Sequence, residues 1–310
     1  MDGVLVIDKP EGWTSHDVVA KIKRALKARK VGHLGTLDPA ATGVLPLVID
    51  GATRFARVLE IGEKEYLATL KLGEETDTYD AEGKVVKSAE TGVLTKLDLE
   101  DAFARFRGVI KQVPPMYSSV KRSGTPLYKL ARKGITVDRV PKEVEIKTLE
   151  LIEVALPSVR FRAVCSRGTY IRTLCHDIGE VLGCFGHLSW LRRTRSGAFT
   201  LEGALGPSEP KEKLEKNIIP LEEALIRVSG GFKALSVDDR TAARIRLGGR
   251  FAPEEWEGFF PSFEDSEMVR FTNKGETIAL AEFTRRGGWP EKGVFGIKKV
   301  FSREGTAVNG

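Results

Sequence analysis

The 310-residue chain carries 49 lysine and arginine residues against 43 acids, and charged residues make up 30% of it. That length is enough for one large domain and a small one, because single hydrophobic cores stop growing at roughly 250 to 300 residues. No apolar run approaches the roughly 20 residues that cross a bilayer, so a helical membrane protein is excluded.

Cysteine and amide usage indicate where the protein works. Cys165, Cys175 and Cys184 form an odd count without disulfide spacing, and no cationic segment at the start leads into a long apolar stretch. We therefore expect a cytoplasmic protein. One glutamine and three asparagines, set against many charged residues, indicate a thermophilic source. A melting temperature in the mesophile range would contradict that expectation.

The chain begins with an apolar run, residues 4–7, which predicts a strand that ends before Pro10, because proline offers no N–H to a ladder. Lys9, next to that proline, has an ordinary interpretation as a solvated turn lysine. A helix should follow, with Thr14 or Ser15 as its cap. Its buried face should consist of Val18, Val19, Ile22 and Leu26.

Residues 30–43, with the sequence KVGHLGTLDPAATG, place one acid, Asp38, in a glycine-rich loop. Pro39 keeps Asp38 out of helical geometry, and glycines permit backbone angles that side chains would forbid. The pattern predicts a carboxylate held in one posture, with His33 nearby. A tight turn with a turn-favouring aspartate and a hydrogen-bonded histidine is the competing interpretation.

Alternation and periodicity predict a strand over 44–49, a helix over 52–59 and a half-covered strand over 64–70. Tyr66 stands at the start of the third element, where a tyrosine is usually packing. A cap at Asp98 then predicts a helix. Its apolar stripe should be Leu99, Ala102, Phe103 and Phe106.

Residues 113–147 mix aromatic and basic side chains. Rings stack on bases and cations meet phosphates, so the mixture predicts a clamp for single-stranded RNA, and a solvated basic hairpin is the alternative. Residues 121–172 hold twelve bases against five acids, which indicates a docking face for phosphates. The relevant side chains are Tyr117, Lys121, Arg122, Tyr128, Lys129, Arg132 and Lys133.

Residues 159–165 alternate as a strand, and the run RGTYIRTL at 167–174 leads into a helix that should end near Leu182. Within that helix Arg172 stands beside apolar residues. Unless it lies on the surface it needs an acid, because a buried unpaired guanidinium is costly. Four potential zinc ligands nearby lack zinc spacing, so we predict no metal site: Cys175, His176, Cys184 and His187.

Three prolines at 207, 210 and 220 indicate a linker, and a short helix should occupy 221–226. Beyond it, residues 235–239 should cap a helix that runs through Leu247 and is ended by Gly248 and Gly249; three apolar runs follow, at 268–271, 277–283 and 294–300. These runs predict the strands of a small β-barrel. A purely structural cap on the main domain is the alternative.

Three motifs resemble those of the TruB-type tRNA pseudouridine synthases: GHLGTLDPAATGVLP at 32–46, KxY followed by LGxxTDTxDxxG up to Gly83, and RGTYIRTL. Two positions depart from the usual family pattern, Leu34 (more often Thr) and Gly186 (more often Ala). The resemblance spans about residues 1 to 200. It implies an α+β fold with a long, mainly antiparallel sheet and a central cleft.

The same resemblance implies the domain organisation. Residues 1–230 would be the catalytic domain, with 113–147 as a thumb-like insertion that is mobile without RNA. Residues 231–310 would be a PUA-like RNA-binding domain. The substrate would be the T-loop uridine at position 55 of tRNA, converted to pseudouridine after base flipping.

Residue roles also follow from the resemblance. Asp38 would be catalytic, Arg172 would pair with it, and Tyr66 would stack on the uracil. Whether Asp38 adds to C1′, adds to C6 or removes the 2′-proton stays open. No metal, cofactor or obligatory protein partner is expected. The substrate-binding side chains would be Lys9, His33, Lys121, Arg122, Lys129, Arg132, Tyr170 and Leu191.

Two other functions remain open at this point. One is a non-catalytic tRNA-binding or folding factor, against which the intact Asp38, Tyr66 and Arg172 argue. The other is a guide-RNA-dependent synthase that works with partner proteins. Activity of the isolated chain on a bare T-arm hairpin would separate the second alternative from a stand-alone enzyme.

Overall fold

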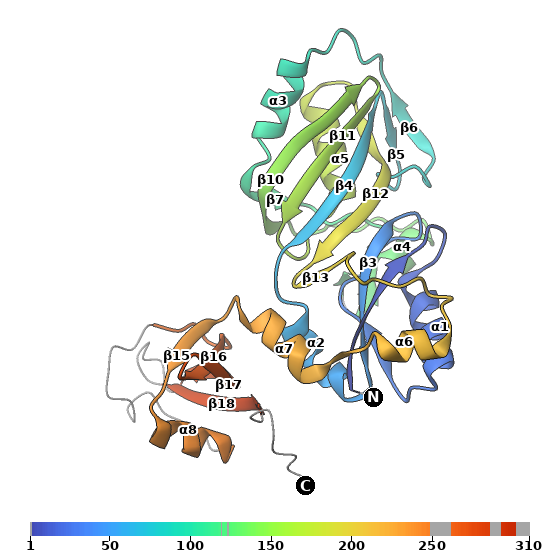
Figure 1. Cartoon of the computed structure of the whole chain (residues 1–310). Coiled ribbons are helices and arrows are strands. Elements are labelled where there is room, and N and C mark those ends of the chain that lie inside the picture. Colours follow the sequence, from blue (N-terminus) through green and yellow to red (C-terminus); the bar gives the residue numbers. More distant parts are fainter. Residues whose placement is uncertain (1, 119, 123, 249–261, 286–292, 302–310) are drawn as a thin grey trace. The chain divides into compact units, whose positions relative to one another are not determined.

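The computed structural model describes residues 2–118, 120–122, 124–248, 262–285 and 293–301 (Figure 1). The chain divides into two units, Met1–Ile218 and Ile219–Gly310. The sequence analysis places the catalytic domain's end later, at residue 230, and that functional division stays a prediction. Within the described ranges no helix is both long and apolar enough to cross a bilayer.

The first unit is built on one long sheet, as predicted, and most of its neighbouring strands are antiparallel. β2 (Val31–His33) pairs with β3, and β13 (Phe199–Thr200) pairs with β12. The order along the sheet is β1 (Gly3–Lys9), β3 (Thr42–Ile49), β12 (Gly186–Ser196), β4 (Lys64–Leu72), β11 (Ser158–Cys165), β10 (Lys142–Ala155) and β7 (Gly108–Gln112).

One junction in this sheet is parallel. β12 runs alongside the start of β3, where Arg192 lies opposite Thr42 and Arg193 opposite Gly43. Parallel pairing brings the same ends of two strands together. The junction therefore places the loop that precedes β3 beside the middle of β12.

Helices cover the sheet and complete the core. α1 (Ser15–Leu26) is capped by Thr14, whose side chain exchanges hydrogen bonds with Asp17 in a capping box. Its buried face is the predicted stripe. α5 (Ile171–Val181) packs against β12 and β4 (Figure 1). The other helical segments are η1 (Asp50–Phe55), α2 (Ala56–Leu59), α3 (Lys96–Ala104), α4 (Leu127–Ala131) and α6 (Lys211–Lys216).

Two helix predictions need correction. The helix expected over 52–59 is a 3₁₀ helix up to Phe55 followed by one α-helical turn. The cap of α3 is Thr95, and Asp98 is the third helical residue that bonds back to it. A Thr-x-x-Asp sequence allows either residue as cap, and the reciprocal pair decides it.

The last residues of the predicted 113–147 insertion are part of the long sheet. Lys142–Lys147 belongs to β10, where Lys142 lies opposite Gln112 and buried Val144 and Ile146 alternate with exposed residues. The segment between the paired ends of β7 and β10 is therefore 113–141. It holds α4 and two short strands, β8 (Lys121–Arg122) and β9 (Thr125–Pro126). A separate hairpin, β5 (Glu74–Thr76) and β6 (Val85–Ser88), carries most of the LGxxTDTxDxxG part of the second motif, whose KxY part lies in β4.

The second unit has a four-stranded sheet in the order β15 (Lys233–Ser236), β16 (Met268–Asn273), β17 (Glu276–Arg285) and β18 (Gly293–Val300). Phe263, Phe271, Phe283 and Phe295 pack against one another in its core. In the residues described the strand order does not close, so the PUA-like barrel stays a prediction. The remaining elements are β14 (Ile219–Pro220), α7 (Leu221–Ser229) and α8 (Asp239–Arg246).

Candidate active site

The loop that carries Asp38 is fixed from both sides by buried side chains. Ser15, at the start of α1, accepts a hydrogen bond from the Leu37 N–H and donates one to the Leu37 carbonyl. The Lys9 ammonium donates to the Pro39 carbonyl oxygen at 3.0 Å. The residues on each side of Asp38, Leu37 and Pro39, are therefore tied to the N-terminal strand and helix.

A third clamp comes from β12. Arg193 is fully buried, and its guanidinium donates to the carbonyl oxygens of Gly35 (3.0 Å), Thr36 (3.3 Å) and Val44 (2.8 Å). The described residues contain no carboxylate ion-paired with it. Gly43 permits this approach, because a Cβ at that position would collide with the Arg193 carbonyl and φ there is +103°.

Asp38 forms an ion pair with Arg172 from the first turn of α5, as the resemblance implies. The Arg172 Nε atom lies 3.0 Å from Asp38 Oδ2, and Nη2 lies 3.4 Å from Oδ1. Arg172 is 5% exposed, and its side chain also donates to the Tyr117 carbonyl at 2.8 Å. Interior placement excludes the alternative of a surface helix arginine.

Asp80 is a second acid on the same guanidinium, and the sequence analysis missed it. Its Oδ2 atom lies 3.2 Å from Arg172 Nη1. Thr78 Oγ1 and the Glu82 N–H donate to its other oxygen, and Thr76 donates to its carbonyl. Arg172 therefore lies between two carboxylates, one of them held in place by the loop after β5.

The pKa values of Asp38 in the loop and of Lys9 beneath it are both shifted from their ordinary values. Burial raises the pKa of the Asp38 carboxyl, and the Arg172 guanidinium opposes that rise. Burial lowers the pKa of the Lys9 ammonium to about 8, while the Asp38 charge opposes the fall. All three Lys9 protons are used, since Pro10 and Trp13 carbonyls accept the other two.

An open cleft of ≈ 300 Å³ lies over these groups. That volume includes space open to solvent, so the feature is an open cleft and not a closed cavity. Its wall is mostly apolar, with the Asp38–Arg172–Asp80 charges at one side. The lining residues are Asp38, Ala40, Ala41, Asp80, Ala81, Arg172, Leu188, Ser189, Trp190 and Leu191.

Of the predicted site residues, Asp38, Arg172 and Leu191 line this cleft, whereas Tyr66 and His33 do not. Tyr66 is buried in β4 opposite Arg193, and burial raises its pKa to about 12. His33 is half-buried in β2, where burial lowers its pKa, and its Nδ1 atom has no hydrogen-bond partner in the described part of the chain.

The remaining predicted residues lie elsewhere. Tyr170 is half-buried at the cap of α5, and its peptide groups exchange hydrogen bonds with the Gln112 side chain. Lys9 is fully buried beneath the loop. Arg122, Lys129 and Arg132 are exposed in the 113–141 segment, where the Arg132 guanidinium lies 5.6 Å from the Tyr128 ring centroid. The side chain of Lys121 lies outside the described residues.

Ser15 and Arg193 are further residues that the sequence analysis missed. Ser15 was considered only as a helix cap, and Arg193 stood unremarked in the run LRRTRSG. The sequence could have predicted a second acid such as Asp80. The Arg172 guanidinium has five N–H donors, and one carboxylate satisfies only two of them, so a buried Arg172 needs further acceptors. No local pattern reveals that Arg193 turns inward.

Known proteins match this chain over most of its length. Residues 23–171 match the model of the TruB family pseudouridylate synthase N-terminal domain, and 172–226 match the tRNA pseudouridylate synthase B C-terminal domain. The chain is 44% identical over 292 residues to tRNA pseudouridine synthase B of Syntrophus aciditrophicus, covering 91% of each chain. It is 43% identical over 286 residues to the same-named protein of Geobacter sulfurreducens, covering 91% of this chain and 93% of the relative.

A solved structure extends the likeness to three dimensions. The crystal structure of a Cbf5–Nop10–Gar1 complex contains a chain with a TM-score of 0.70 and 29% identity to this one. The match covers 97% of this chain and 85% of the other. The long sheet and its helices are therefore shared with a chain that is crystallised among partner proteins.

Proposed function

The chain belongs to the TruB family of pseudouridylate synthases, and we propose from this membership and the site geometry that it converts the T-loop uridine at position 55 of tRNA to pseudouridine. The observation that carries the proposal is the Asp38–Arg172 ion pair at the edge of an apolar cleft. A binding factor would not need a carboxylate held in this way. Sequence relatives that match this chain over about nine tenths of their length are named tRNA pseudouridine synthase B.

The reaction is an isomerisation that the described residues suit. The N1–C1′ bond of uridine breaks, the uracil rotates, and C5 bonds to C1′ while the C5 proton is lost and N1 gains one. Asp38 supplies the carboxylate, and Arg172 keeps it ionised and aimed. The apolar wall around Leu191 would retain the detached base. The isomerisation involves no net redox change and needs no energy input.

Reaching the uracil requires that the nucleotide leave its loop. An RNA base stacked in the T-loop cannot contact Asp38, so we propose base flipping into the cleft. Tyr66, kept neutral by its raised pKa, would lie against the uracil once the cleft is occupied. His33, whose pKa is lowered by burial, offers a neutral imidazole next to the Asp38 loop. Tyr170 and Lys9 would support the pocket from beneath.

The 113–141 segment would bind the tRNA arm through Arg122, Lys129 and Arg132, with Lys121 beside them. The second unit would act as a PUA-like RNA-binding module. We place the enzyme in the cytoplasm, without an obligatory protein partner. A guide-dependent synthase is not favoured, because the sequence relatives are named tRNA pseudouridine synthase B.

The test uses the purified full chain, an Asp38→Asn variant and an Asp101→Asn control, which alters an exposed acid of α3. Each is incubated with a T-arm stem-loop transcript, and pseudouridine is mapped by chemical modification and primer extension. We expect conversion by the wild type and the control, and none by Asp38→Asn. If no variant converts the uridine although all bind the hairpin, stand-alone catalysis is wrong.

A further inference from the structure

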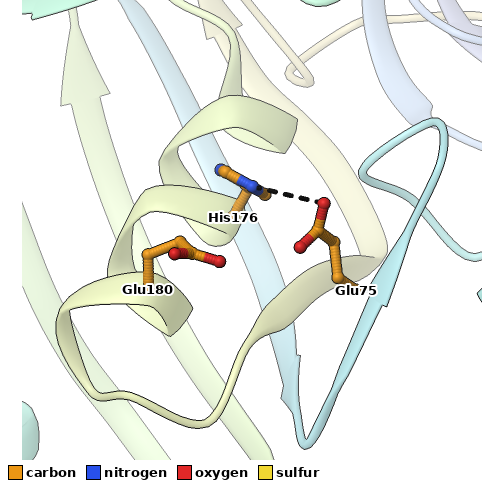
Figure 2. Close-up of side chains that lie close together, drawn as sticks. All are labelled: Glu75, His176 and Glu180. Atoms are coloured by element: carbon orange, nitrogen blue, oxygen red, sulfur yellow. Dashed lines mark ion pairs between the residues drawn. The ribbon is translucent and has the colours of Figure 1, made fainter. Parts of the chain in front are cut away.

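Three side chains that could ligate a metal meet away from the cleft (Figure 2). His176 and Glu180 lie one helical turn apart on α5, which puts them on the same face. Glu75 reaches them from β5. Their ligand atoms all lie within 4.8 Å of one another, and the three side chains point toward a common space.

The orientation of His176 is fixed by its neighbour. Its Nδ1 atom lies 3.0 Å from Asp177 Oδ1, and an ionised carboxylate only accepts, so Nδ1 carries the proton. In the neutral ring, Nε2 then presents its lone pair to Glu75 Oε1 at 3.7 Å, which is too long for a hydrogen bond. A histidine that bonds a carboxylate through one nitrogen and faces a cation with the other is the usual arrangement at metal centres.

Glu75 is oriented in the same way. Its Oε2 atom accepts a hydrogen bond from Lys87 Nζ at 2.7 Å, which leaves Oε1 on the side of His176. Two ligands of a tetrahedral zinc ion lie about 3.4 Å apart, given metal–ligand bonds near 2.1 Å. The observed 3.7 Å gap is therefore close to the spacing that two ligands of one ion require.

We propose that Glu75, His176 and Glu180 bind one divalent first-row transition-metal ion, with water completing its coordination. One imidazole and two carboxylates suit Zn²⁺ and the divalent first-row transition metals next to it in the series of binding affinities. Lys87 also lies 3.9 Å from Glu180 Oε1, and the ion would displace that longer contact. Both side chains are solvent-accessible, so the exchange needs no rearrangement of the core.

The consequence of binding would be structural, because Asp38 is not a member of the cluster. The ion would fasten the β5–β6 hairpin to α5. Thr76, next to Glu75, donates to the Asp80 carbonyl, and Arg172 stands one turn before His176. Metal binding would thus stabilise the two elements that present Asp80 and Arg172 to each other.

The test measures Zn²⁺ binding to the tag-free, chelator-treated full chain by titration calorimetry, with Co²⁺ absorption as a spectroscopic readout. We expect one site per chain. The His176→Ala variant should bind at least about tenfold more weakly, since a lost ligand costs at least as much as a lost supporting group. His16→Ala, which alters an exposed histidine of α1, should match the wild type.

A thermal readout gives a second check. Saturating Zn²⁺ should raise the melting temperature of the wild type and of His16→Ala, because a ligand of the native state stabilises it by mass action. The rise should vanish in Glu180→Gln, which changes an exposed side chain and should fold even if His176→Ala does not. If Zn²⁺ shows no saturable binding, or binds the wild type and both cluster variants with equal affinity, the proposal is wrong. The cluster is then only an ion-pair network.

Discussion

The Asp38 loop and the 113–141 segment differ in how they are held. Backbone groups of the loop are bound by Ser15, Lys9 and Arg193, three buried side chains from different elements. The 113–141 segment consists of short elements, and its side chains Arg122, Lys129, Arg132 and Lys133 are exposed. The contrast separates a preorganised chemical site from an adaptable binding surface.

This difference makes a kinetic prediction of its own. Changes around the loop should lower kcat, because they disturb the posture of the carboxylate in the transition state. Changes in the 113–141 segment should raise KM for tRNA and leave kcat nearly unchanged. Four variants test this division.

The largest effect should come from Arg172→Gln. Loss of the guanidinium leaves Asp38 and Asp80 without their partner, and we expect kcat to fall about 10²- to 10³-fold, in the range of a lost electrostatic group. Removing one partner of a buried ion pair should also cost about 3–5 kcal/mol of unfolding free energy. Single-turnover kinetics and urea unfolding measure the two effects.

The pH profile of the same variant isolates the electrostatic part. The pKa of Asp38 is raised by burial and lowered by Arg172, so removing Arg172 should raise it further. Activity requires the ionised carboxylate, and the acidic limb of kcat/KM should therefore move to higher pH. An unmoved limb would mean that Arg172 acts only on structure. Arg172→Lys should restore part of the shift.

Next in size is Arg193→Lys. A single ammonium cannot reach three carbonyls as the planar guanidinium does, so the loop should lose part of its clamp. We expect kcat to fall about 10- to 100-fold with KM for tRNA unchanged. Arg195→Lys, on the same strand, is the matched control. An effect confined to KM would contradict the division drawn above.

The opposite pattern should follow from replacing Arg122, Lys129 and Arg132 together with Gln. We expect KM to rise about tenfold at physiological salt and kcat to change less than about twofold. The slope of log affinity against log salt should become shallower by about 2 to 3, given roughly 0.7 to 0.9 per phosphate contact. Glutamine at Lys96, Arg105 and Lys111, exposed bases of α3 and β7, should leave the slope unchanged.

The smallest effect concerns Lys9. Its pKa of about 8 predicts an alkaline limb in kcat there, since the neutral amine loses one of three hydrogen bonds to the loop. We expect a several-fold fall between pH 7 and 9, absent from Lys9→Met. Between pH 8 and 10.5 the unfolded chain binds more protons at this group, so its contribution to stability rises with pH. If raising the pH through 8 lowers kcat without lowering the unfolding free energy, the loss of activity comes from the Lys9 hydrogen bonds to the loop and not from unfolding.

The features that depend on residues close together in the sequence could be predicted. The capping box and apolar stripe predict α1, and the motifs single out Asp38 and Arg172. Contacts between residues far apart in the sequence could not be predicted. Ser15 resembles any helix cap, and its bonds to Leu37 arise only when α1 packs beneath the loop.

The local sequence pattern also failed to predict β12. Its sequence GHLSWLRRTRS places adjacent arginines where alternation would show a strand, so the pattern hides a central element of the sheet. Arg192 points to Asp8 at 2.8 Å, whereas Arg193 is buried beneath the loop. Two identical side chains take opposite roles because strand neighbours face opposite sides.

The parallel junction of β12 with β3 has a consequence for synthesis on the ribosome. Arg193 binds the carbonyls of Gly35 and Thr36 across 158 and 157 positions of sequence, so the clamp is among the least local contacts of the unit. Loop closure over such a distance comes late in folding. A nascent chain that has not yet released β12 therefore holds the whole GTLDP motif but no assembled site, and chemistry begins only when the domain is nearly complete.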